Sequence, residues 1–177
     1  MIADLQKKKS SAAQLIDGKP AEQFYAEKLA AGQTAFDAHD YGTAKTAWEE
    51  AQRVKPLPPD AKTSYDAATQ QVAKLDAAKA LMSERKYADA LNDLQTLQQQ
   101  DPTNVTVQNM ISNAHFNLGA TALQEENLSE ATKQFDEVLK INPNDELARR
   151  SHELAQRYDG RAKDLLYRIY VKYLPLR

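Results

Sequence analysis

Apolar and small residues recur along the chain at helical spacing, and residues 112–145 show the pattern most fully. Apolar positions there lie three and four residues apart on both sides of a polar turn. This spacing predicts two amphipathic helices packed against each other. The marker positions of this helix–turn–helix segment are Leu118, Gly119, Leu123, Leu128, Ala131, Phe135, Val138 and Pro143.

Two earlier segments, residues 25–58 and 71–104, carry the same markers at the same offsets. Each copy has a small residue where the two helices must approach closely, and a second small residue twelve positions later on the partner helix. A bulky residue four positions further on is expected to fill the space between neighbouring pairs. The three sets are Gly32, Ala44 and Trp48; Ala78, Ala90 and Leu94; and Gly119, Ala131 and Phe135.

The segment 112–145 resembles a tetratricopeptide repeat (TPR), a unit of 34 residues. The resemblance implies an all-α fold, a TPR-like right-handed α-solenoid of antiparallel helix pairs. The intervals from Pro56 to Pro102 and from Pro102 to Pro143 are 46 and 41 residues, longer than the family period. We therefore expect lengthened first helices in the second and third repeats, the former from an N-cap at Asp60 to about Glu84.

The predicted organisation is a first repeat at 21–58, a second at 59–104 with the extended first helix, and a third at 105–145. Residues 146–177 form a degenerate helix pair, 146–158 and 161–173, divided at Asp159-Gly160. Residues 1–20 are predicted as a partial repeat, its second helix only, or as an N-terminal cap, because Leu15, Ile16 and Pro20 align with the end of a repeat. An opening in mid-repeat predicts a fragment of a larger TPR protein, and the abundant Ala and Gln indicate a bacterial one.

Composition narrows the function classes. A formal charge of −2 argues against nucleic acid as a partner. The absence of Cys excludes disulfides, thiol catalysis and Cys-ligated metals. We find no signal peptide and no apolar run of membrane-spanning length, so we expect a soluble protein of the cytoplasm or periplasm, with the choice left open.

Catalytic and metal-binding patterns are missing. His39, His115 and His152 are far apart in the sequence, and the zinc-protease pattern that begins at His152 fails because Gln156 stands where the second His is required. No nucleophile elbow or Gly-rich phosphate loop occurs. We predict no enzyme activity, no metal and no cofactor.

In the family that the chain resembles, the first helices of successive pairs line a concave groove in which partner peptides lie. Carried over to this chain, the resemblance predicts a protein or peptide partner. The carboxylate clamp of one family subgroup is incomplete here, since Leu29 replaces its first Lys. The alternative is that these positions pack beneath the extra helical turns. The predicted groove residues are Gln33, Phe36, Lys79, Met82, Asn113, Phe116, Asn117 and Arg150.

The predicted C-terminal helix carries two apolar stripes, more than a capping helix needs. One consists of Ala162, Leu165, Leu166, Ile169 and Tyr173. We predict that the other is an assembly surface covered by another part of the chain, a second copy or a following domain. Self-association through residues 161–176 is therefore the alternative function, and membrane contact is disfavoured. The second stripe consists of Tyr167, Tyr170, Val171 and Leu174.

Overall fold

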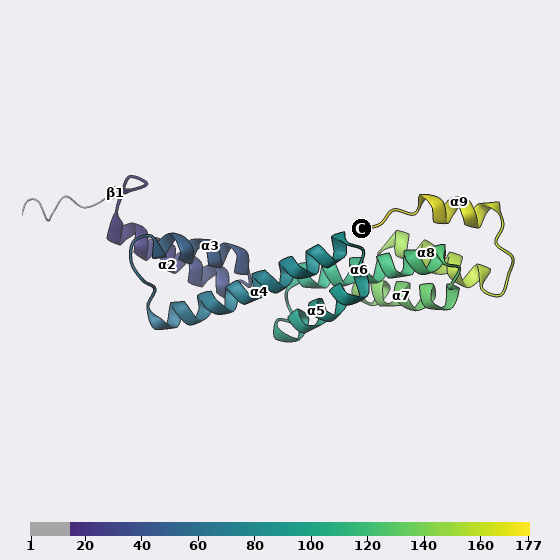
Figure 1. The fold of residues 1–177 in the computed structure, drawn as a ribbon, viewed down its shortest axis with the longest axis horizontal. Coiled ribbons are helices and arrows are strands. Elements are labelled where there is room, and N and C mark those ends of the chain that lie inside the picture. Colours follow the sequence, from purple (N-terminus) through teal and green to yellow (C-terminus); the bar gives the residue numbers. More distant parts are fainter. Residues whose placement is uncertain (1–14) are drawn as a thin grey trace, which may run out of the picture. The chain divides into compact units, whose positions relative to one another are not determined.

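A computed structural model describes residues 15–177, which form eight helices and one short β-hairpin. The predicted all-α fold is confirmed, with helices joined mostly by tight turns (Figure 1). The elements are β1 Leu15–Ile16, β2 Lys19–Pro20, α2 Ala21–Asp37, α3 Tyr41–Gln52, α4 Pro59–Ser83, α5 Tyr87–Gln100, α6 Val105–Gln124, α7 Leu128–Ile141, α8 Glu146–Tyr158 and α9 Leu165–Tyr173.

The chain divides into two compact units, one ending at Ala73 and the other beginning at Lys74. The division falls inside α4, a helix of 25 residues. The first unit contains α2 and α3, and the second contains α5 to α9. Each unit has a core of its own, and each is described by itself below.

Residues 15–20, which precede α2, form a β-hairpin. The sequence predicted the end of a helix there. Leu15 pairs with Pro20 and Ile16 with Lys19. Asp17 and Gly18 form the turn with φ of 51° and 77°. Two consecutive left-handed residues favour a two-residue hairpin, for which Asp-Gly is a preferred sequence. The helix prediction is wrong for residues 15–20, and its remainder lies outside the described residues.

The small residues of the first and third pairs lie where two helices approach most closely. A Cβ added to Gly32 would meet the Trp48 indole at 2.6 Å or less, and one added to Gly119 would meet the Phe135 ring at 2.9 Å. Trp48 and Phe135 are both fully buried. The bulky residue thus fills the space over the glycine of its own pair. Contact with the next pair, the predicted role, is also present, since Trp48 clusters with Ala68.

The second pair follows the same register with an alanine in place of the glycine. Ala78, Ala90 and Leu94 are fully buried and form one cluster. A smaller bulky residue, Leu94, accompanies the larger Ala78, which conserves the volume between the helices. The register predicted from the marker positions is therefore confirmed in all three pairs.

Each of the three turns inside a pair contains a left-handed residue that is not glycine. His39, Arg85 and Glu126 have φ of 60°, 61° and 59°. The residue after each donates its main-chain N–H to a carbonyl five positions earlier, at 2.8–2.9 Å, as in a Schellman motif. The three turns therefore end their helices by the same hydrogen bonds.

Most predicted helix boundaries agree with the structure, with two corrections. Helix α4 begins at Pro59, so Asp60 lies in its first turn and is not the N-cap. Helix α9 begins at Leu165 and not at Arg161, because the Asp164 side chain accepts a hydrogen bond from the Tyr167 N–H and caps the helix there. Gly160, with φ of 67°, ends α8 as expected.

Candidate functional site

Within the second unit, α9 folds back against α6, and its buried side chains join the core that α6, α7 and α8 share (Figure 1). Tyr167, Val171 and Leu174 are buried in that core. The Tyr167 hydroxyl donates a hydrogen bond of 2.6 Å to the Leu123 carbonyl oxygen. Burial raises the pKa of Tyr167 to about 12, and the Glu126 carboxylate shifts it in the same direction.

Another part of the chain therefore covers the second stripe, which is one of the three possibilities that the sequence left open. Tyr170, its fourth member, is half-buried, and its hydroxyl lies 2.9 Å from the Ser151 hydroxyl. The tyrosines of this stripe find polar partners inside the unit, whereas the other stripe offers mostly aliphatic groups. The stripe left exposed consists of Leu165, Leu166, Ile169 and Tyr173.

Beyond α9 the chain runs across α6 and ends at Arg177, whose main chain is bound by one side chain. Asn117 Nδ2 donates to the Arg177 carbonyl oxygen at 2.6 Å, and the Arg177 N–H donates to Asn117 Oδ1 at 2.8 Å. An amide that bonds both main-chain groups of one residue resembles the pairing between two β-strands. Asn117 is fully buried, so these two bonds satisfy an amide that water cannot reach.

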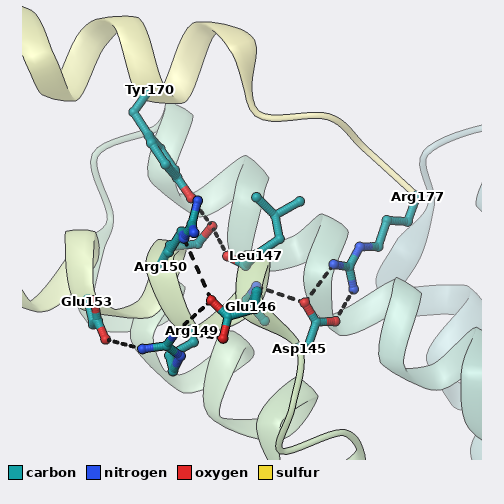
Figure 2. Close-up of polar contacts among 10 residues, drawn as sticks. Asp145, Glu146, Leu147, Arg149, Arg150, Glu153, Tyr170 and Arg177 are labelled. Atoms are coloured by element: carbon teal, nitrogen blue, oxygen red, sulfur yellow. Dashed lines mark hydrogen bonds and ion pairs between the residues drawn. The ribbon is translucent and has the colours of Figure 1, made fainter.

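The side chain of Arg177 is held by two further residues. Its guanidinium carbon lies 3.8 Å from the centroid of the Phe116 ring, a cation–π contact. Its Nη2 donates to Asp145 Oδ1 at 2.8 Å, and its Nη1 donates to the other carboxylate oxygen (Figure 2). We call the surface formed by Phe116, Asn117 and Asp145 the third-repeat groove.

Asp145 has two functions in this arrangement. Its carboxylate accepts a hydrogen bond from the Ala148 N–H at 3.0 Å and so caps α8. The Arg177 guanidinium, through its hydrogen bonds, is the main reason why the pKa of Asp145 lies below its ordinary value. The hydrogen bond to α8 holds the ionised carboxylate in position, and this contact does not involve the arginine.

Two of the predicted groove residues of the second unit lie in the third-repeat groove, and the other four do not form part of it. Phe116 and Asn117 lie together in the third-repeat groove. Arg150 is exposed and pairs with Glu146 at 3.8 Å (Figure 2). Lys79 is exposed and pairs with Asp76 at 3.0 Å. Asn113 and Met82 are half-buried, and Met82 packs on the core of the second pair.

In the first unit, Gln33 lines a cavity of about 370 Å³ between α2 and the start of α4. Phe36 does not line it. That ring packs in the core, with its centroid 5.5 Å from the Tyr41 ring and 5.7 Å from the Trp48 ring. We call the cavity the first-repeat pocket. Its lining is mostly apolar and consists of Ala26, Leu29, Ala30, Gln33, Pro58, Asp60 and Ala61.

Sequence reasoning missed Asp145 and Arg177. Asp145 entered the sequence analysis only as the last residue of the third repeat, and Arg177 was not considered as a site residue. One signal was present in the sequence: Asn117 is an amide on a helix whose neighbouring positions are apolar, which indicates a buried polar contact. The identity of its partner, sixty residues away, could not be read from the sequence.

Across residues 15–177, no group of three His, Asp or Glu side chains could hold a metal ion. In the same part of the chain, no helix is long and apolar enough to cross a membrane. The contacts found in the third-repeat groove are hydrogen bonds, an ion pair and ring packing.

The fold and the groove define a class, that of helical-repeat proteins built from antiparallel helix pairs. Residues 112–145 match the family model of the tetratricopeptide repeat. With the shared register of the three pairs, this match supports a tetratricopeptide repeat assignment. Tetratricopeptide repeats are generally protein–protein interaction modules. No significant match is found among curated proteins or among solved structures.

Proposed function

We propose that this chain is a non-catalytic scaffold that binds an extended segment of a partner protein along the first helices of its repeats. The observation that carries the proposal is the third-repeat groove, in which Asn117 bonds the main chain of an extended segment of the chain itself. A groove that already bonds one main chain has donors and acceptors in suitable positions for another.

The first-repeat pocket supports the same function in the first unit. Its lining is largely apolar, and Gln33 and Asp60 are its two residues with polar side chains. A volume of about 370 Å³ is at the lower end of the range for ligand pockets and accommodates one or two apolar side chains of a peptide. Leu29 is half-buried, packs on the core and presents its remaining surface to the pocket.

Selection of peptides from a random library tests this function. Peptides selected on the whole chain and labelled with a fluorophore should bind with a Kd measurable by fluorescence anisotropy. Leu29→Asp should weaken binding at least about tenfold, the effect of about 1.4 kcal/mol, because a carboxylate then enters an apolar lining. Leu165→Asp, a matched change at an exposed leucine of α9, should leave binding unchanged.

Failure of the selection would reject the proposed function. Peptides that bind the wild type and Leu29→Asp equally, and whose binding does not depend on Asn117 or Asp145 either, would also reject it. Circular dichroism on each variant establishes that helicity is retained.

Self-association is the second candidate function, and it depends on the exposed stripe of α9. Four large apolar side chains on a nine-residue helix, between 47% and 71% exposed, form a continuous apolar face. A second copy of the chain would cover that face by pairing two α9 helices.

A further inference from the structure

We propose that the third-repeat groove is an arginine-selective peptide site, and that residues 174–177 are its intramolecular occupant. A partner segment of the same chemistry, extended and with an arginine, would bind there when the C-terminal segment is displaced. The proposal rests on the proposed function for its ligand class, a protein segment, but it concerns a different site from the first-repeat pocket.

The contacts separate into two kinds. The two Asn117 hydrogen bonds contact only main-chain atoms, so they fix an extended residue without selecting its side chain. The contacts that the Phe116 ring and the Asp145 carboxylate make with Arg177 are to its guanidinium. Asn117 can therefore bind the main chain of any extended peptide, whereas Phe116 and Asp145 select its side chain.

Phe116 and Asp145 select arginine over lysine. Both guanidinium Nη atoms donate to the two oxygens of the Asp145 carboxylate, while the central guanidinium carbon lies over the Phe116 ring. A planar fork satisfies both contacts at once, whereas an ammonium group is a single strongly hydrated point. The Arg177 side chain is 25% exposed and that of Asp145 is 9% exposed, so solvent screens this pair less than an ordinary surface pair.

A third anchor lies three residues before the arginine. Leu174 is buried in the core that α6, α7 and α8 share, while Pro175 between the anchors is exposed. The pattern of the occupant is thus a buried apolar residue, two spacer residues and an arginine. A partner segment should present the same order.

The tethered occupant competes with any free ligand. A segment joined to its site by a short connection acts at an effective concentration of about a millimolar, so it masks the groove from weaker ligands. A free peptide should therefore bind better when the anchors of the occupant are removed.

The experiment uses the full chain and a fluorescein-labelled, C-terminally amidated peptide of residues 172–177, Lys-Tyr-Leu-Pro-Leu-Arg. The chains are the wild type, Arg177→Ala, and Leu174→Ser with Arg177→Ala. Fluorescence anisotropy should show at least about tenfold tighter binding to the double variant than to the wild type, as expected when a competitor at millimolar effective concentration is removed.

Selectivity is measured on the double variant. A peptide with lysine in place of the arginine should bind at least about tenfold more weakly, because it loses the fork and the stacking together. Asp145→Asn should reduce the preference for arginine while retaining the α8 cap, since asparagine is as good an N-cap as aspartate. Lys133→Ala, an exposed change on α7, is the matched control and should change neither affinity.

Equal binding of the arginine and lysine peptides would overturn the proposal, as would equal binding to the wild type and the double variant. Loss of helicity in the double variant does not prevent a decision, because Arg177→Ala alone then serves as the displaced form. Peptides whose affinity falls in Leu29→Asp but is unchanged in Asp145→Asn would support the proposed function and reject this inference.

Discussion

At the scale of single residues, glycines determine how closely the two helices of a pair can approach. Gly32 has the Trp48 indole directly over it, whereas Gly42, in the first turn of α3, has no atom closer than 3.8 Å to an added Cβ. Helix propensity favours alanine at both positions by up to about 1 kcal/mol. Packing opposes it only at Gly32.

Gly32→Ala should therefore destabilise the chain by about 1–3 kcal/mol, the usual cost of overpacking a filled core. Gly42→Ala should be neutral or stabilise it by less than about 1 kcal/mol. Urea unfolding followed by circular dichroism measures both changes. A stabilised Gly32→Ala would mean that the indole moves aside easily, contrary to the close packing described here.

At the scale of the element, α9 is a short helix with two usable apolar faces. Its buried face contains the two tyrosines whose hydroxyls contact Leu123 and Ser151. Its first turn is fixed by Asp164, which also accepts a hydrogen bond of 2.7 Å from the Tyr158 hydroxyl. The orientation of the helix is therefore determined by a few polar contacts together with apolar burial.

The docking of α9 should weaken in alkali. The pKa of Tyr167 is raised from its ordinary 10 to about 12, so the protonated hydroxyl is the form that the docked state stabilises. Its contribution is complete below pH 10 and is lost as pH rises from 10 toward 12. Absorbance at 295 nm should show a late tyrosinate step, and hydrogen exchange in α9 should accelerate over the same range.

Tyr167→Phe should reduce that late step and destabilise the unit by about 1 kcal/mol, the worth of one buried hydrogen bond. Part of the step should remain, because a hydrogen bond to Asp164 also raises the pKa of Tyr158. Tyr173→Phe, at an exposed position of the same helix, should leave the late step in place. A late step of undiminished amplitude in Tyr167→Phe would contradict the buried position of this hydroxyl.

At the scale of the whole molecule, the exposed stripe of α9 lies in a basic region. Residues 147–177 contain eight Lys and Arg against three Asp and Glu. Arg168 and Lys172 lie on the same helix as the stripe and are exposed. Two copies that paired through α9 would bring these cations together, so salt should strengthen any self-association by screening their repulsion.

Static light scattering on the whole chain tests this expectation. If α9 mediates assembly, the apparent mass should rise with protein concentration and with salt, and Leu166→Lys with Ile169→Lys should return it to that of one chain of 19.8 kDa. Phe116 and Asn117 are untouched by this variant, so peptide binding should persist. A single-chain mass for the wild type under all conditions would eliminate the second candidate function.

The local pattern of the sequence determined the helices and their register. Gly32, Trp48, Gly119 and Phe135 could be placed because the spacing of small and large residues within a helix pair is a local property of the chain. The long α4 was predictable for the same reason, since nothing between Pro59 and Ser83 interrupts it. The Asp-Gly turn at residues 17–18 is an equally local signal, which the alignment of residues 1–20 to a repeat did not take into account.

Tertiary structure alone decided which face of α9 is buried and what fills the third-repeat groove. Both stripes of α9 have helical spacing, and the choice between them depended on acceptors supplied by α6 and α8. The contact of Arg177 with Asn117 joins residues sixty positions apart, and its ion pair with Asp145 joins residues thirty-two apart. Periodicity describes how a helix presents its own side chains, but it carries no information about which distant segment they meet.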